Sequence, residues 1–106
     1  MDFAIILTTA SAVEEGQSIA NTLVEKQLAA CVNIIPKISS VYRWEGQIQS
    51  ETEVLLLIKT TKDLEAEVYR EVQAVHSYDT PELITLPITN GSETYLDWLT
   101  AAVRKQ

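Results

Sequence analysis

The chain has 106 residues and a net charge of −7, from 8 basic and 15 acidic residues. This length predicts a single domain over residues 1–106, and an apolar content of 46% excludes intrinsic disorder. The acidic excess disfavours nucleic acid as a partner, because phosphates require a basic surface. No basic cluster and no long apolar segment points to a membrane. The single Cys31 favours a reducing compartment such as the cytoplasm.

The first predicted elements are a strand and a helix. The short apolar run at residues 3–7 is typical of a strand that is buried on both faces. Ser11 and Glu14 match a capping box, in which each side chain bonds to the backbone of the other. Apolar residues then recur at spacings of three and four. We therefore expect a helix over residues 12–29.

The middle of the chain predicts one long hairpin. Residues 31–44 are rich in β-branched and aromatic side chains, and Pro36 implies a bulge, a bend or an unpaired edge within that strand. Glu45 and Gly46 indicate a tight turn, after which residues 47–60 return as a second strand.

The last third predicts a helix, a strand and a second, shorter helix. Thr61 can cap the first helix and His76 ends it, with a regular apolar stripe between them. Residues 82–89 predict a strand, and a turn with a cap precedes the C-terminal helix. The order β-α-β-β-α-β plus a terminal helix is the ferredoxin-like pattern, an α+β sandwich on an antiparallel sheet.

The predicted hairpin is too long for one small domain. A strand of 14 residues over positions 31–44 spans about 46 Å, whereas a domain of this size is about 33 Å across. The hairpin tip carries Tyr42, Trp44 and Ile48, and a free two-stranded ribbon with such a tip is marginal in water. We expect the hairpin to protrude and pair with another copy of the chain. The alternative is that it bends at Pro36 and folds back onto its own sheet.

His76 and Cys31 are the residues with the most versatile chemistry. His76 could bind a metal or shuttle protons, or it could simply bond the last carbonyls of its helix. Cys31 could act as a nucleophile or a soft-metal ligand, although a lone Cys is more often a small buried apolar residue. Lys59 could hold an anion, pair with a carboxylate or extend to solvent. Trp44 and Trp98 are more typical of a core or an interface.

Five short runs resemble the CutA family of divalent-cation tolerance proteins. They cover essentially the whole chain in order: LAACVN at 28–33, VYRWEG at 41–46, IKTT at 58–61, HSYDTPEL at 76–83 and YLDWL at 95–99. The resemblance implies a homotrimer of ferredoxin-like subunits that exchange hairpin arms. It also implies a role in tolerance to copper and other divalent cations, and a likeness to PII-type signalling proteins with ligand clefts between subunits.

The resemblance also implies a polar cluster at the cleft. The matching positions are Cys31, Trp44, Glu53, Lys59, His76, Tyr78 and Glu82. Copper prefers imidazole and thiolate ligands, which makes His76 and Cys31 the candidate metal ligands. Some bacterial relatives bind copper through a Cys at the position of Thr8 and through adjacent histidines, whereas this chain has Thr8, Val75 and a single His.

Four functions remain open at this point. The first is a non-enzymatic, trimeric metal-tolerance protein that binds copper or another divalent cation. The second is a PII-like sensor that binds a small anion near Lys59. The third is a thiol enzyme that uses Cys31 with His76 as its base. The fourth is a scaffold that binds another protein.

Overall fold

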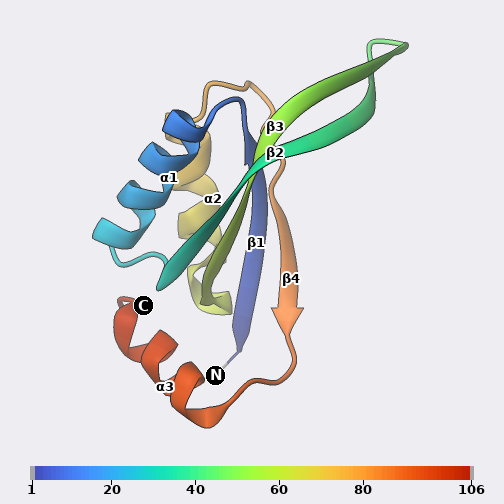
Figure 1. The fold of residues 1–106 in the computed structure, drawn as a ribbon. Coiled ribbons are helices and arrows are strands. Elements are labelled where there is room, and N and C mark those ends of the chain that lie inside the picture. Colours follow the sequence, from blue (N-terminus) through green and yellow to red (C-terminus); the bar gives the residue numbers. More distant parts are fainter. Residues whose placement is uncertain (1, 106) are drawn as a thin grey trace.

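A four-stranded antiparallel sheet with strand order β2-β3-β1-β4 organises the chain (Figure 1). The computed structural model describes residues 2–105, so the two outermost positions of the predicted domain 1–106 lie outside the described residues. The elements are β1 (Phe3–Ala10), α1 (Val13–Glu25), β2 (Cys31–Trp44), β3 (Gln47–Thr61), the 3₁₀ helix η1 (Lys62–Leu64), α2 (Glu65–Val75), β4 (Ile84–Ile88) and α3 (Glu93–Ala102). The ferredoxin-like α+β prediction is confirmed.

Helices α1 and α2 cover one face of the sheet, and the core lies between these two layers (Figure 1). In β1, Ala4, Ile6 and Thr8 are fully buried, whereas Ile5 and Leu7 are only partly buried. The prediction that this strand is buried on both faces is therefore wrong for the single chain. The reason is that the two helices lie on the same side, which leaves alternate residues on an open face.

Helix α1 begins and ends differently from the prediction. Glu15, rather than Glu14, reaches back to Ser11, whose backbone N–H lies 3.2 Å from Glu15 Oε1. The helix ends at Glu25 rather than near residue 29, because Gln27 adopts a φ of 58° and the N–H of Leu28 bonds to the Leu23 carbonyl at 2.9 Å. This is the Schellman arrangement that closes many helices.

The long hairpin has the predicted strand 31–44, and β3 ends one residue beyond the predicted boundary. The register of β2 against β3 shifts between Ile35 and Ile38, so Pro36 lies in a bulge, where Lys37 has a φ of 62°. Glu45 and Gly46 both have positive φ, at 50° and 77°. Such a pair forms a two-residue turn whose twist matches that of the flanking strands.

The outer half of this hairpin projects from the domain. Strand β1 pairs with β3 only as far as Ala10 opposite Val54, so residues 38–53 pair solely with one another. We call residues 38–53 the arm. It extends the molecule to 44 × 25 × 21 Å and leaves Val41 and Ile48 about 70% exposed (Figure 1). The predicted protrusion is confirmed, and the alternative of a fold-back at Pro36 is wrong.

The remaining elements are the edge strand β4 and the C-terminal helix α3. Strand β4 is shorter than predicted, at five residues, and Pro87 is tolerated because β4 is an edge strand beside β1. Helix α3 begins as predicted, with Ser92 as its cap, and buries Leu99 completely. Among the described residues, no helix has the length and apolar character that a membrane crossing requires.

Candidate functional site

The imidazole of His76 is completely buried at the C-terminal end of α2. Its Nδ1 lies 3.0 Å from the backbone nitrogen of Tyr78, and its Nε2 lies 2.7 Å from the carbonyl oxygen of Thr9. Because an N–H can only donate, Nδ1 accepts from Tyr78 and Nε2 donates to Thr9. The hydrogen-bond network therefore assigns a neutral ring with its proton on Nε2, and it uses both nitrogens to connect β1 to the loop after α2.

Glu15 of α1 holds the same loop through its backbone. Its Oε2 accepts the backbone N–H of Ser77 at 2.8 Å, and its Oε1 accepts from the hydroxyl of Ser11 at 3.0 Å. Partial burial opposes ionisation, but the hydrogen bonds from Ser77 and Ser11 outweigh it and lower the pKa of Glu15 to about 2. The carboxylate also lies 3.7 Å from His76 Nδ1, so a negative charge faces the imidazole.

Tyr78 connects this loop to the root of the arm. Its hydroxyl donates to Glu53 Oε2 at 2.8 Å, and its ring packs 4.7 Å from the ring of His76. Burial and the bond to Glu53 raise the pKa of the Tyr78 hydroxyl above its usual range. Glu53 is itself only 8% exposed. Glu15, Glu53, His76 and Tyr78 thus form one connected polar group, which we call the loop cluster.

A second group lies at the other end of the sheet. Cys31 begins β2 opposite Lys59 of β3, and both side chains are partly buried. The Lys59 ammonium lies 5.9 Å from the centre of the Tyr95 ring, and Tyr95 packs against Trp98 at 5.5 Å. None of the described carboxylates forms an ion pair with Lys59. We call Cys31, Lys59, Tyr95 and Trp98 the basal cluster.

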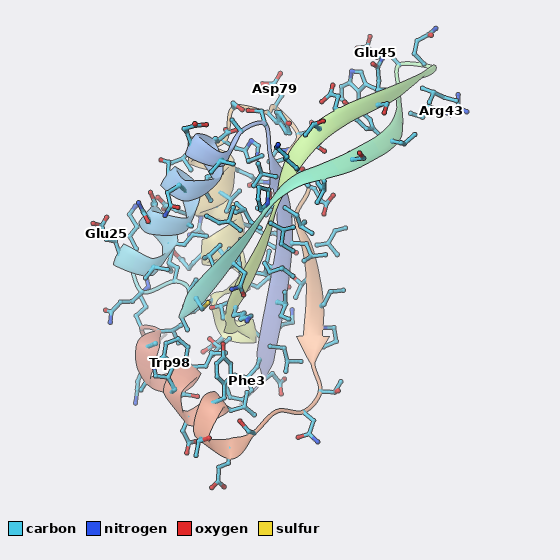
Figure 2. The ribbon with its side chains drawn as sticks, viewed as in Figure 1. Phe3, Glu25, Arg43, Glu45, Asp79 and Trp98 are labelled. Carbon is cyan, nitrogen blue, oxygen red and sulfur yellow. The ribbon has the colours of Figure 1, made fainter. Side chains whose placement is uncertain are left out.

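The two clusters are well separated within one chain. Figure 2 places Trp98, a residue of α3, toward the bottom of the molecule and Asp79 in the loop at the opposite end. The β3 partners of Cys31 and Thr9 are Lys59 and Leu55, which lie four positions apart. Four strand residues span about 13 Å. Cys31 and the Thr9 carbonyl that His76 contacts therefore lie far beyond hydrogen-bond reach of each other.

The seven candidate residues thus fall into separate places. Glu53, His76 and Tyr78 come together, and Cys31 lies beside Lys59. Trp44 is 55% exposed near the arm tip, where Figure 2 shows its neighbours Arg43 and Glu45. Glu82 is exposed in the loop before β4. One chain by itself therefore does not assemble the full predicted set.

Metal ligation by a single chain is not supported by these positions. His76 has no free nitrogen in this arrangement, and Cys31 lies at the other end of the sheet. Within residues 2–105, no group of three or more His, Cys, Asp or Glu side chains is arranged to hold an ion. The same separation removes a nucleophile–base pair of Cys31 and His76 within one chain.

Two contributors to these clusters escaped the sequence analysis. Glu15 is not among the candidate residues above, because its contact with Ser77 spans 62 positions. Tyr95 is named above only within the run YLDWL, and its position near Lys59 depends on how α3 packs. Only the arrangement of elements in space reveals either contact.

The fold and these clusters define the class of the protein, a ferredoxin-like α+β domain with a projecting two-stranded arm. Residues 4–102 match the family model described as "CutA1 divalent ion tolerance protein". The chain belongs to the CutA1 divalent ion tolerance family. Tolerance of divalent ions is the role for which this family is named.

Curated CutA proteins from a plant and a bacterium are similar in sequence to this chain. The chain is 49% identical over 100 residues to "Protein CutA, chloroplastic" of Arabidopsis thaliana, covering 94% of this chain and 55% of that relative. It is 45% identical over 95 residues to the "Divalent-cation tolerance protein CutA" of Thermus thermophilus, covering 90% of this chain and 92% of that relative. The chain thus spans about half of the chloroplastic relative and nearly all of the bacterial one.

Solved structures show the same architecture. The crystal structure of CutA1 from Oryza sativa superposes with a TM-score of 0.97 at 42% identity, covering 100% of this chain and 97% of that one. The structure of the Thermus thermophilus protein superposes with a TM-score of 0.94 at 42% identity, covering 96% of this chain and 99% of that one. The family resemblance noted in the sequence is confirmed.

Proposed function

We propose that this chain acts in tolerance to divalent cations as a homotrimer whose arms dock on neighbouring subunits. The observation that carries the assembly is the unpartnered apolar surface of the arm. Val41 and Ile48 are 70% and 71% exposed, and Trp44 is 55% exposed. Side chains of this size are normally covered in a soluble protein, and an open two-stranded ribbon is marginal by itself.

The open face of the sheet supports the same assembly. It lacks a covering helix layer, and it presents Ile35, Ile84 and Leu86, which are 41–49% exposed, next to half-buried Ile5 and Leu7. Arm and open face together supply apolar surface of the kind that forms obligate interfaces. The single chain leaves both surfaces uncovered.

Sedimentation equilibrium tests the assembly directly. We expect one species at three times the chain mass over a wide concentration range. A monomer at micromolar concentration would overturn the trimer.

For the cation, we propose copper or another divalent ion with Cys31 as the ligand. The Cys31 residue is partly buried, and within residues 2–105 its thiol forms a weak hydrogen bond to Asn33 Oδ1 at 4.0 Å. His76, in contrast, would have to lose its bond to Thr9 or its bond to Tyr78 before it could bind a metal. Thiolate is a preferred ligand of copper, and ions shared between subunits would recruit more than one thiol.

Titration calorimetry with Cu(II) and Zn(II) tests this assignment on the wild type and on the matched variants Cys31→Ser and His76→Gln. We expect saturable binding that Cys31→Ser removes and His76→Gln retains. Loss in His76→Gln alone would overturn the assignment to Cys31. An absence of saturable binding to the wild type would show that tolerance does not act through direct ligation.

A second candidate is a PII-like sensor of a small anion, and one observation favours it. Lys59 is a partly buried cation with an aromatic neighbour, Tyr95, and without a carboxylate partner among the described residues. A thermal-shift screen of carboxylates and phosphates would detect such a ligand. Stabilisation that disappears in Lys59→Met supports the sensor, and an empty screen opposes it.

We propose a non-enzymatic role in the cytoplasm. The distance between Cys31 and the Thr9 carbonyl that His76 contacts supports a non-enzymatic role, because thiol catalysis requires a base within hydrogen-bond reach of the thiol. The free thiol of Cys31 supports a cytoplasmic location, because reducing compartments keep such thiols free.

A further inference from the structure

The connection between β4 and α3 contains an Asn–Gly pair that neither cluster uses. Asn90 and Gly91 are both exposed, between the end of β4 at Ile88 and the helix cap Ser92. The backbone N–H of Gly91 donates to Oδ1 of the preceding Asn90 at 2.9 Å. The side-chain amide of Asn90 therefore lies against the nitrogen of the next residue, with its oxygen facing the N–H.

This arrangement brings two reactive atoms close together. Oδ1 is bonded to Cγ at about 1.2 Å, so the Gly91 nitrogen lies within about 4 Å of the Asn90 Cγ. Glycine leaves this nitrogen unshielded, because it has no side chain. A Cβ at position 91 would lie 3.2 Å from Leu96 Cδ2, so a larger residue would crowd Leu96.

We propose that Asn90, three residues before the start of α3, is a site of spontaneous deamidation that converts this position to an aspartyl or isoaspartyl form. The Gly91 nitrogen loses its proton to hydroxide, which becomes water, and bonds to Asn90 Cγ. The Cγ–Nδ2 bond then breaks as Nδ2 takes a proton from water, so that ammonia leaves and hydroxide is regenerated. The product is a five-membered succinimide. Water then opens one of its two C–N bonds to give Asp or isoAsp. The net reaction consumes one water and releases one ammonia, and it requires neither an oxidant nor a reductant.

The other two asparagines of the chain provide internal controls. Asn21 lies within α1, where its Oδ1 accepts from Gln17 at 2.9 Å and the next residue is Thr22. Asn33 lies within β2 and precedes Ile34. Both following residues are β-branched and belong to regular hydrogen-bonded elements, which hinders the attack.

The modification would act on the first turn of α3. It adds a negative charge close to the helix N-terminus, where the free N–H groups favour an anion. The isoaspartyl form also adds one backbone carbon just before Ser92, whose hydroxyl accepts from Tyr95 N at 3.4 Å. Because the Tyr95 ring lies over Lys59, a shift of this turn would reach the basal cluster.

Peptide mapping by mass spectrometry tests the proposal on the intact protein, incubated in the folded state at mildly alkaline pH. We expect conversion at residue 90 to be roughly tenfold or more faster than at Asn21 and Asn33. An isoaspartyl methyltransferase, used as a probe, should label the aged wild type but not an aged Asn90→Gln variant. Equal conversion at the three asparagines would overturn the proposal.

A second comparison separates the folded geometry from the dipeptide alone. The same incubation in concentrated urea measures Asn90 in the unfolded chain. We expect the folded chain to react at least as fast as the unfolded one, because its Gly91 N–H already points at Asn90. A folded rate far below the unfolded rate would show that the native loop protects Asn90, which contradicts the proposal.

Discussion

The two halves of the β2–β3 hairpin belong to one ladder but differ in composition and in their surroundings. In the inner half, Leu56 and Ile58 lie between β1, β2 and the helices and are completely buried. In the arm, Val41 and Ile48 are about 70% exposed. Both halves belong to one β ladder, although residues 49–53 of the arm are polar and residues 54–58 of the inner half are apolar. The contrast shows that strands form in both settings, whereas burial depends on which elements pack against the strand.

The transition between the halves lies where β1 ends. Beyond Ala10, β3 pairs with β2 alone among the described strands, and the bulge at Pro36 changes the register at nearly the same level. The loop cluster occupies this boundary, with Glu53 at the root of the arm and His76 bonded to Thr9. The arm thus begins at the polar group that joins β1, α1 and the loop after α2.

The largest effect is expected for a truncation in the inner half. Leu56→Ala removes a fully buried side chain from the core and should lower the free energy of unfolding by about 3 kcal/mol. Urea unfolding measures this difference. A loss below about 1 kcal/mol would mean that the core collapses around the gap, and it would weaken the contrast with the arm.

At the boundary, Glu15→Gln should destabilise the protein by about 2 kcal/mol at neutral pH, after allowance for solvent screening. The folded carboxyl has a pKa of about 2 against an ordinary 4.5, so its stabilisation is complete above pH 4.5 and declines as the pH falls toward 2.

Urea unfolding of both proteins over this pH range measures the difference, which should narrow as the solution becomes more acidic. Glu14→Gln, on an exposed neighbour in the same helical turn, is the matched control. A constant gap between wild type and Glu15→Gln at all pH values would contradict the role of the ionised group.

In the arm, Ile48→Glu should leave the fold of a chain intact and weaken the proposed association by about tenfold or more, which corresponds to about 1.4 kcal/mol. The reason is that a charge on an exposed apolar side chain perturbs little in one chain but is desolvated in an interface. Sedimentation measures association, and circular dichroism measures the fold. Gln47→Glu adds the same charge beside it, and equal effects of the two would argue against specific docking of Ile48.

The smallest effect concerns a polar atom inside the core. Thr8 is completely buried, and its hydroxyl has no hydrogen-bond partner among the described residues. Thr8→Val replaces this hydroxyl with a methyl group of similar shape and should raise the free energy of unfolding by about 1 kcal/mol. Thermal and urea unfolding measure the gain. An unchanged or lower stability would show that the hydroxyl is satisfied in solution.

Sequence patterns predicted the elements well where the signals are local. The bounds of β2, the turn at Glu45 and Gly46, and the cap at Ser92 all match the structure, since each depends on residues within a few positions. Helix α1 ended early because Gln27, which is neither Gly nor Asn, adopts the left-handed conformation of the helix end. No composition rule signals such a residue.

The site was predicted less completely, for a different reason. Glu53, His76 and Tyr78 were named as candidates and lie together, but Glu15 was missed and Cys31 lies at the far end of the sheet. The resemblance to the family supplied a set of positions without their distances within one chain. Trp44 and Glu82 lie apart from both clusters, so their place in any shared cleft depends on how chains assemble.

By itself, the sequence determined the element order, the ferredoxin-like topology and an arm too long for one domain, because periodicity, turn residues and strand length are properties of neighbouring positions. Only the tertiary structure decided that β1 is open on one face, that both His76 nitrogens are occupied and that Glu15 holds Ser77. These contacts join residues up to 67 positions apart. Such pairs form when packed layers bring together segments that are far apart in the sequence, and local sequence patterns do not predict which segments meet.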